Sequence, residues 1–153
     1  MFTKSPQKIN QNIPITKEII FIVEDNEVYA KSLQTFIQTR FPNIKGIKIF
    51  RIGEMCLMEL HRNPSIVIMD YFLNSKYEEA ENGLEIIKRI KAEKPETNII
   101  VLSAQENFNV ILEAIKEYDC NYVQKDKEAF SNIEQLIKAI FNRKKTTAFE
   151  SGN

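Results

Sequence analysis

Residues 65–73 have the sequence Ser-Ile-Val-Ile-Met-Asp-Tyr-Phe-Leu, in which four apolar residues precede one carboxylate. A run of β-branched and other apolar residues of this kind is typical of a strand buried on both faces of a parallel sheet. The run ends at one carboxylate, Asp70, which would lie at the carboxyl end of the strand. Because open α/β sheets keep their sites at that edge, Asp70 is the first candidate functional residue.

Four further apolar runs, alternating with amphipathic stretches, accompany this strand along the chain. Strands are predicted over 18–23, 44–50, 65–73, 98–102 and 121–124, and helices over 28–41, 54–62, around 84–90, around 108–115, and over 130–141. Single helices between strands require right-handed crossovers and a parallel sheet covered on both faces. The predicted fold class is therefore α/β, a doubly wound sheet of five parallel strands. For its strand order we expect the flavodoxin-like 2-1-3-4-5, one of the common orders of such sheets.

The length of 153 residues fits one globular domain, which we expect over residues 18–142. Polar residues dominate both ends, so a flexible N-terminal arm is expected over 1–17 and a flexible C-terminal tail over 143–153. The two cysteines, Cys56 and Cys120, are far apart and have no metal-ligand spacing. We therefore predict that both are buried free thiols.

The overall charge is balanced, with 21 basic and 21 acidic residues. No net field therefore attracts nucleic acid or an anionic membrane, and neither is expected as a partner. The first 17 residues lack the apolar core of a signal peptide, and no run approaches the ~20 apolar residues of a membrane span. These features predict a soluble, cytoplasmic protein.

Two more carboxylates should lie beside Asp70. In the strand order 2-1-3-4-5 the first and third strands are neighbours, and Glu24 and Asp25 directly follow the first strand. Three carboxylates at one edge would repel one another unless a cation neutralised them. Mg²⁺ suits such a set, because it prefers oxygen ligands and commonly holds phosphate oxygens as well. The sequence therefore predicts a magnesium site built for a phosphoryl group.

The fourth and fifth strands end in residues that could complete this site. Ser103 offers a hydroxyl and Lys125 an ammonium, and both groups can hold phosphoryl oxygens. Asp70 would then be the nucleophile that forms an aspartyl phosphate, stabilised by the nearby cations.

At these positions the chain resembles the receiver domains of two-component response regulators, over about residues 18–141. Five short motifs in the right order carry the resemblance: Val23-Glu24-Asp25-Asn26, Ile68-Met69-Asp70, Asn82-Gly83-Leu84-Glu85-Ile86-Ile87, Leu102-Ser103-Ala104 and Tyr122-Val123-Gln124-Lys125. The resemblance implies a stand-alone phosphorelay protein that is not an enzyme in the ordinary sense. Asp70 would accept a phosphoryl group from the phosphohistidine of a sensor histidine kinase or a histidine phosphotransfer protein.

The same resemblance implies roles for the residues around Asp70. Asp25, Asp70 and the backbone carbonyl of Phe72 would hold Mg²⁺ directly, and Glu24 would hold it through water. Ser103 and Tyr122 would reorient on phosphorylation. This change would alter the affinity for an output partner protein of the face formed by the fourth helix, fifth strand and fifth helix. The resemblance leaves open whether the protein also forms a homodimer.

The sequence departs from the family pattern at three places. Asn74 stands near the usual proline, and Gly83 lies 13 residues after Asp70, so the loop 74–82 is about five residues longer than usual. The proline that usually follows the strand-five lysine is replaced by Asp126, which could help to cap the last helix. The loop is either a determinant of partner choice or a solvated insertion.

Two alternative functions stay open at this point. The first is a Mg²⁺-dependent phosphohydrolase with an aspartyl nucleophile, which would resemble the haloacid dehalogenase group. That group has a second aspartate two positions after the nucleophile, where this chain has Phe72. The second is a receiver-like binding module that takes no phosphate, although the chain retains the acids, the hydroxyl and the lysine of the site.

Overall fold

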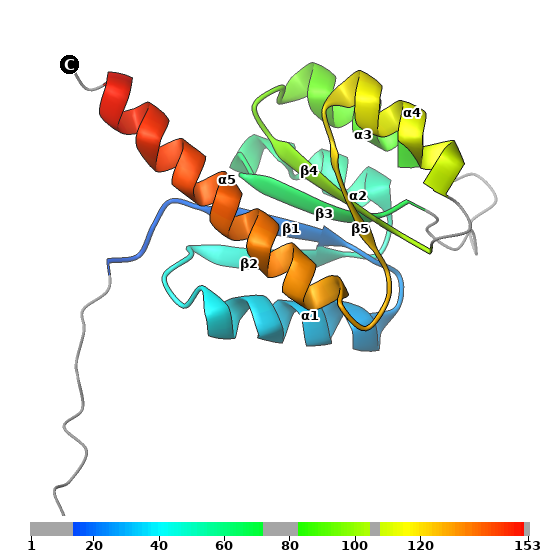
Figure 1. The fold of residues 1–153 in the computed structure, drawn as a ribbon, viewed down its shortest axis with the longest axis horizontal. Coiled ribbons are helices and arrows are strands. Elements are labelled where there is room, and N and C mark those ends of the chain that lie inside the picture. Colours follow the sequence, from blue (N-terminus) through cyan, green and yellow to red (C-terminus); the bar gives the residue numbers. More distant parts are fainter. Residues whose placement is uncertain (1–13, 72–82, 105–107, 152–153) are drawn as a thin grey trace, which may run out of the picture.

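The structure is a computed structural model that describes residues 14–71, 83–104 and 108–151 (Figure 1). Its elements in chain order are β1 (Ile19–Val23), α1 (Glu27–Arg40), β2 (Gly46–Phe50), α2 (Gly53–Met58), the 3₁₀ helix η1 (Leu60–Arg62), β3 (Ile66–Asp70), α3 (Gly83–Glu93), β4 (Asn98–Ser103), α4 (Phe108–Tyr118), β5 (Asn121–Gln124) and α5 (Ala129–Ser151). Phe72 and the loop 74–82 lie outside the described residues.

The strands form one parallel five-stranded sheet in the order β2-β1-β3-β4-β5. This order confirms the predicted flavodoxin-like α/β fold, and Figure 1 shows β1 and β3 side by side near the centre of the sheet. The carboxyl ends of β1 and β3 therefore meet at one edge, because neighbouring parallel strands run in the same direction.

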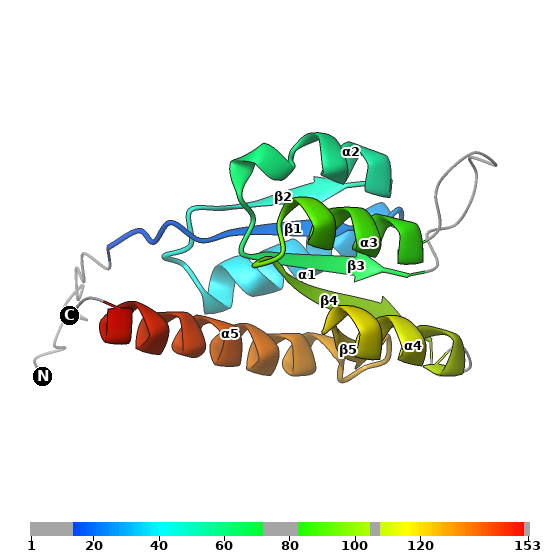
Figure 2. The same cartoon turned by 90° about the horizontal axis from the view of Figure 1, so that it is seen from above.

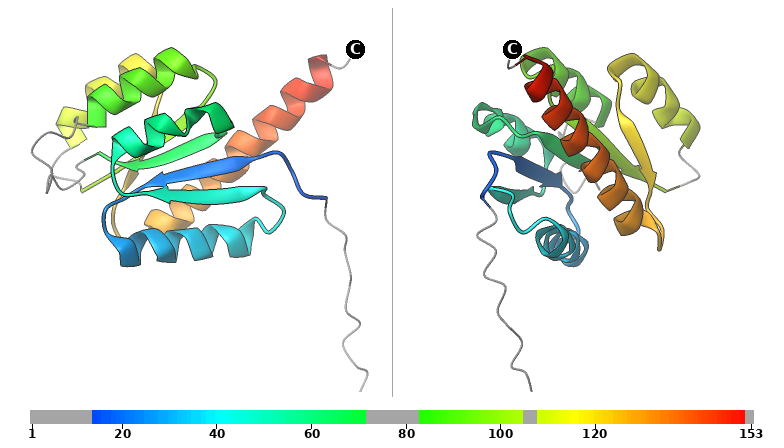
Figure 3. Two further views of the ribbon diagram at one scale, coloured as in Figure 1. Left: turned by 180° about the vertical axis from the view of Figure 1, so that it is seen from behind. Right: turned by 60° about the vertical axis from the view of Figure 1, so that its left-hand side comes forward.

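Side chains of β3 contribute to an apolar core on each face of the sheet. Ile66 and Ile68 belong to the core under α1 and α5, whereas Val67 and Met69 belong to the core under α2, α3 and α4. This division follows from the two-residue period of a strand, and it explains why all five residues of β3 are buried. Figures 2 and 3 show α2 and α3 on one side of the sheet and α5 on the other.

Both cysteines confirm the prediction of buried free thiols. Cys56 and Cys120 are unbonded to each other and lie in the core under α2, α3 and α4. Burial raises the pKa of Cys56 to about 12 and that of Cys120 to about 11. Both thiols therefore stay protonated, and a protonated thiol is a poor nucleophile.

Two predicted helix boundaries need correction. The helix expected over 54–62 is two elements, α2 and η1, because the Glu59 N–H donates to the Cys56 carbonyl (3.0 Å) and tightens the turn. The last helix does not end near residue 142 but continues to Ser151, well into the predicted tail. No proline or glycine occurs between residues 129 and 151, so nothing in the sequence stops α5 before Gly152.

Within the described residues no helix has both the length and the apolar character that crossing a bilayer requires.

Gly83 allows α3 to begin close to the strand that carries Asp70. A Cβ atom at this position would lie 2.7 Å from the backbone carbonyl oxygen of Tyr71, which cannot move without shifting the end of β3. We expect Gly83→Ala to lower the free energy of unfolding by about 1–3 kcal/mol, measured by urea denaturation. Gly46→Ala is the control, because nothing lies within 4 Å of a Cβ there. Equal losses in the two variants would contradict the steric explanation.

Candidate functional site

Three carboxylates meet at the carboxyl edge of the sheet, as the sequence predicts. β1 ends at Val23, which is the register partner of Met69 in β3, so Glu24 and Asp25 emerge beside Asp70. One carboxylate oxygen from each of the three acids lies within 4.8 Å of the others. This is a set of oxygen donors of the kind that a hard divalent cation binds.

The loop after β1 holds Glu24 in place through its backbone. The Glu24 N–H donates to the Phe50 carbonyl (2.9 Å), and the Asn26 N–H donates to Oε1 of Glu24 (3.1 Å). Asn26 also caps α1, since its Oδ1 accepts from the Tyr29 N–H (2.9 Å). The side chain of Glu24 is only 1% exposed, so its carboxylate position is set by these contacts rather than by solvent.

Lys125 connects β5 to the acids. Its backbone N–H donates to the Ser103 carbonyl (2.8 Å), and its Nζ donates to Oε2 of Glu24 (2.8 Å) and to Oδ2 of Asp70 (3.0 Å). Burial by itself would lower the pKa of Lys125, but the hydrogen bonds to the two carboxylates outweigh it and raise the pKa. The ammonium therefore stays charged and lies where a second anion could share it.

The raised pKa of Glu24 shows that the ammonium of Lys125 does not fully neutralise the negative charge at this edge of the sheet. Burial raises the pKa of Glu24 to about 7; the bond from Lys125 opposes that shift, while the negative charge of Asp70 adds to it. A carboxylate in such surroundings gains from any further positive charge placed beside it. The donor set and its excess of negative charge both fit a bound divalent cation.

Ser103 lies at the end of β4, one residue beyond Leu102, the register partner of Asp70. It is 1% exposed, and its hydroxyl donates to the carbonyl of Ala104 (3.3 Å). The structure thus brings Ser103 to the predicted edge of the sheet. Its hydroxyl is directed to the neighbouring backbone carbonyl of Ala104 and not into the carboxylate cluster.

Tyr122 in β5 is linked to Ser103 and not to the acids. Its hydroxyl donates to the Ser103 carbonyl (3.3 Å), and its half-buried ring packs edge-on against Phe108 at the start of α4, with 5.0 Å between ring centroids. The predicted pair of Ser103 and Tyr122 is therefore in contact. The carbonyl of Phe72, predicted as a metal ligand, lies outside the described residues.

Tyr29 is a site residue that the sequence analysis did not single out, although it lies in the helix predicted over 28–41. The Lys125 Nζ lies 4.4 Å from the centre of the Tyr29 ring, a cation–π distance. Burial raises the pKa of the Tyr29 hydroxyl, which has no hydrogen-bond partner among the described residues. The signal in the sequence was its place in the first turn after the acid pair, where a side chain can reach the strand ends.

Comparisons with known proteins identify the kind of domain. Residues 20–141 match the family model of the response regulator receiver domain. None of the curated proteins matches the chain.

Solved structures with the same fold include a redox sensor of the streptococci described as evolved from two-component response regulators, with TM-score 0.72, 18% identity and coverage of 87% of this chain. The response regulator RcsB of Salmonella typhimurium has TM-score 0.69, 21% identity and 82% coverage. This chain spans 55% and 62% of those two proteins. A receiver domain of a DNA-binding response regulator from Colwellia psychrerythraea, with TM-score 0.68, 22% identity and 82% coverage, is itself covered to 98%. At these identities the likeness concerns the fold alone.

The contact between Tyr29 and Lys125 leads to a stability prediction. Tyr29→Leu removes the ring under the ammonium and its edge-to-face contact with Phe130, so we expect a loss of about 1–2 kcal/mol in the free energy of unfolding. Tyr29→Phe keeps the ring and removes only a hydroxyl that has no hydrogen-bond partner in the described part of the chain, so it should equal or exceed the stability of the parent protein. Urea denaturation of both variants measures this, and a larger loss in Tyr29→Phe than in Tyr29→Leu would contradict it.

Proposed function

Because the chain belongs to the response regulator receiver domains, a family of phosphoacceptor signalling domains, we propose that Asp70 accepts a phosphoryl group from a phosphohistidine. One observation carries this proposal: the Asp70 carboxylate ends the buried strand β3 between the acids Glu24 and Asp25 and the ammonium of Lys125. A nucleophile, a cation and a set of metal ligands therefore share one edge. The donor would be a sensor histidine kinase or a histidine phosphotransfer protein.

In the proposed transfer, a carboxylate oxygen of Asp70 forms a bond to phosphorus while the P–N bond of phosphohistidine breaks. The electron pair of that bond stays on the imidazole nitrogen, which then takes up a proton. Lys125 would donate to the phosphoryl oxygens as their charge shifts, because its ammonium already lies 3.0 Å from Asp70. Glu24, Asp25 and Asp70 would hold Mg²⁺, which supplies further positive charge to the same oxygens.

The switch would use the link between Ser103 and Tyr122. We propose that the Ser103 hydroxyl turns from the Ala104 carbonyl toward the phosphoryl group. Tyr122, whose hydroxyl donates to the backbone carbonyl of Ser103, would then reorient as the end of β4 shifts. The Tyr122 ring contacts Phe108 in α4, so its movement would change the face formed by α4, β5 and α5. An output partner would read the phosphorylation state at that face.

The two alternatives have less support. A phosphohydrolase of the haloacid dehalogenase type would need an acid two residues after Asp70, where the chain has Phe72. A module that binds without phosphorylation would not need the paired acids and the lysine that the structure brings together.

Magnesium binding should stabilise the fold through the acid cluster. At a free Mg²⁺ concentration 100 times the Kd, binding to the native state adds about 2.7 kcal/mol to the free energy of unfolding. Asp25→Asn removes one ligand and should abolish the gain. Asp119→Asn is the matched control, because Asp119 lies before β5 at the other edge and has a φ of 52° that asparagine also adopts. An equal gain in Asp25→Asn would place the metal elsewhere.

Phosphorylation is tested by incubation with acetyl phosphate and Mg²⁺, followed by intact mass measurement. We expect the mass of one added phosphoryl group, absent in Asp70→Asn and after EDTA, and unchanged in Asp119→Asn. Lys125→Met should slow the reaction roughly 10²-fold, the usual effect of losing one preorganised donor.

Other outcomes distinguish the alternatives. No adduct on any variant under any condition would support a binding module that takes no phosphate. Continued release of phosphate from many small phosphate esters, lost in Asp70→Asn, would support a hydrolase.

A further inference from the structure

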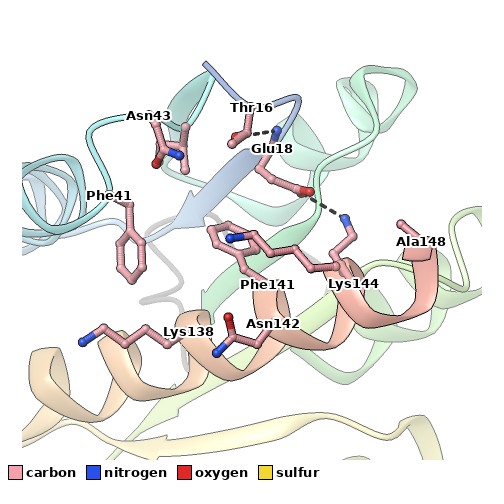
Figure 4. A pocket seen from close by; sticks show the side chains of 11 residues that line it. Thr16, Glu18, Phe41, Asn43, Lys138, Phe141, Asn142, Lys144 and Ala148 are labelled. Atoms are coloured by element: carbon pink, nitrogen blue, oxygen red, sulfur yellow. Dashed lines mark hydrogen bonds and ion pairs between the residues drawn. The ribbon is translucent and has the colours of Figure 1, made fainter. Parts of the chain in front are cut away.

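A groove of about 440 Å³ lies at the edge of the sheet opposite Asp70 (Figure 4). Its walls come from the segment before β1, from the end of α1 with the turn that follows, and from the second half of α5. Glu18 lines this groove at the start of β1, whereas Glu24 follows the other end of the same strand. A ligand in the groove would therefore leave the phosphorylation site uncovered.

Most of the groove is formed by parts of the chain outside the receiver match, which covers residues 20–141. Six of the eleven lining residues lie outside that range: Thr16, Glu18, Asn142, Lys144, Lys145 and Ala148. The continuation of α5 to Ser151 supplies four of them. The groove is thus a feature of this chain's flanking segments.

Hydrogen bonds and an ion pair join the walls of the groove. The Thr16 N–H donates to the Asn43 carbonyl (2.7 Å), which joins the segment before β1 to the turn after α1. Glu18 accepts from the Lys144 ammonium (2.9 Å) and from the Ser65 hydroxyl, so it fixes α5 to the start of β1 and to the residue before β3. The groove is therefore formed before any ligand arrives, which lowers the entropic cost of binding.

The floor of the groove is apolar. The rings of Phe41 and Phe141 meet edge-to-face with 6.0 Å between centroids, and Ile44 lines the groove beside them. All three are only half-buried. Such a floor can take one aromatic or branched aliphatic side chain of a ligand.

The rim of the groove is positively charged. Lys138, Lys144 and Lys145 line it from α5, and Glu18 is the single acid among the lining residues. Glu18 is already paired with Lys144, and Lys138 shares Glu134 with Arg40. The excess charge is therefore positive, and Lys138 and Lys145 lie seven residues apart on one face of the helix.

We propose that this groove binds a short acidic segment of a partner protein, with one apolar side chain on the phenylalanine floor and carboxylates against the lysines. Complementary charge would guide the segment to the rim, and the apolar anchor would supply most of the affinity. A nucleic-acid duplex fits less well, because its bases are paired inside the helix and its surface presents phosphates but no apolar group that could reach the floor.

Two other occupants are disfavoured by their charge. Residues 1–13 contain Lys4 and Lys8 and no acid, so the lysine rim would repel them. A second copy paired along this part of α5 would bring Arg143, Lys144 and Lys145 against the same three residues. Like charges at close range oppose such a pairing.

The test is an NMR titration of the full ¹⁵N-labelled chain with a short blocked peptide in which glutamates flank one phenylalanine. Amide shifts are expected around residues 16–18, 41–44 and 138–148. Two matched peptides, one with serine for the phenylalanine and one with lysines for the glutamates, should bind at least about tenfold more weakly because each loses one part of the recognition. Shifts confined to other surfaces, or no shifts, would overturn the proposal.

Charge reversals locate the binding site. Lys145→Glu should weaken the peptide about tenfold, whereas Lys116→Glu, which makes the same change at an exposed position of α4, should not. Equal weakening in both would indicate a diffuse charge effect and overturn the proposal. Concentration-dependent dimerisation that is lost in Lys145→Glu would also overturn the proposal, because it would identify a second copy as the occupant. Shifts of groove amides caused by Phe2→Ser in the absence of peptide would overturn it too, because they would identify the N-terminal arm as the occupant.

Asp70→Asn should keep the peptide affinity of the parent protein while it loses phosphorylation. The proposal of a peptide-binding groove and the proposal of phosphorylation at Asp70 can therefore be refuted independently of each other. Loss of peptide binding in Asp70→Asn would contradict a docking surface that acts independently of the opposite edge.

Discussion

The ammonium of Lys125 is bonded to both Glu24 and Asp70, and these two contacts hold the acidic edge of the sheet together. It joins residues 101 and 55 positions apart in the sequence, and it reaches across β4 to the ends of β3 and β1. Two carboxylates, one of them almost fully buried, would repel each other at this edge without a cation between them. The same contact prepares the edge for chemistry, because a phosphoryl group would bring more negative charge to that ammonium.

The neighbours of Lys125 fix the positions of the side chains at this edge of the sheet. The Tyr29 ring supports the ammonium from α1, and the backbone of Lys125 is bonded to Ser103 at the end of β4. Ser103 in turn holds the hydroxyl of Tyr122, so a change at Asp70 has a continuous set of contacts to α4. If these contacts adopt a second arrangement, a local change of charge at Asp70 would change the surface at α4.

The opposite edge of the sheet has a different character. There the segment before β1 and the end of α5 are held together by Glu18 and Lys144, and they enclose the aromatic floor of the basic groove. A five-residue strand separates Glu18 and Glu24, the acids at its two ends. We propose that the two edges serve different partners, one at the side of Asp70 and one at the groove formed by the flanking segments.

The strands of the parallel sheet and the acids at its edge could be recognised in the sequence, because buried strands have a characteristic apolar pattern and all parallel strands end on the same side. The strand order does not follow from that pattern and was expected only by analogy with flavodoxin-like sheets. It could not show that Tyr29 lies under Lys125, since that contact joins a helix to a strand end 96 residues later. Nor did it indicate where α5 ends, because the polar residues after Asn142 suit a tail and a solvated helix equally well. Only the tertiary structure decided these points, since the packing of α1, α5 and the segment before β1 brings together residues whose local sequences carry no sign of each other.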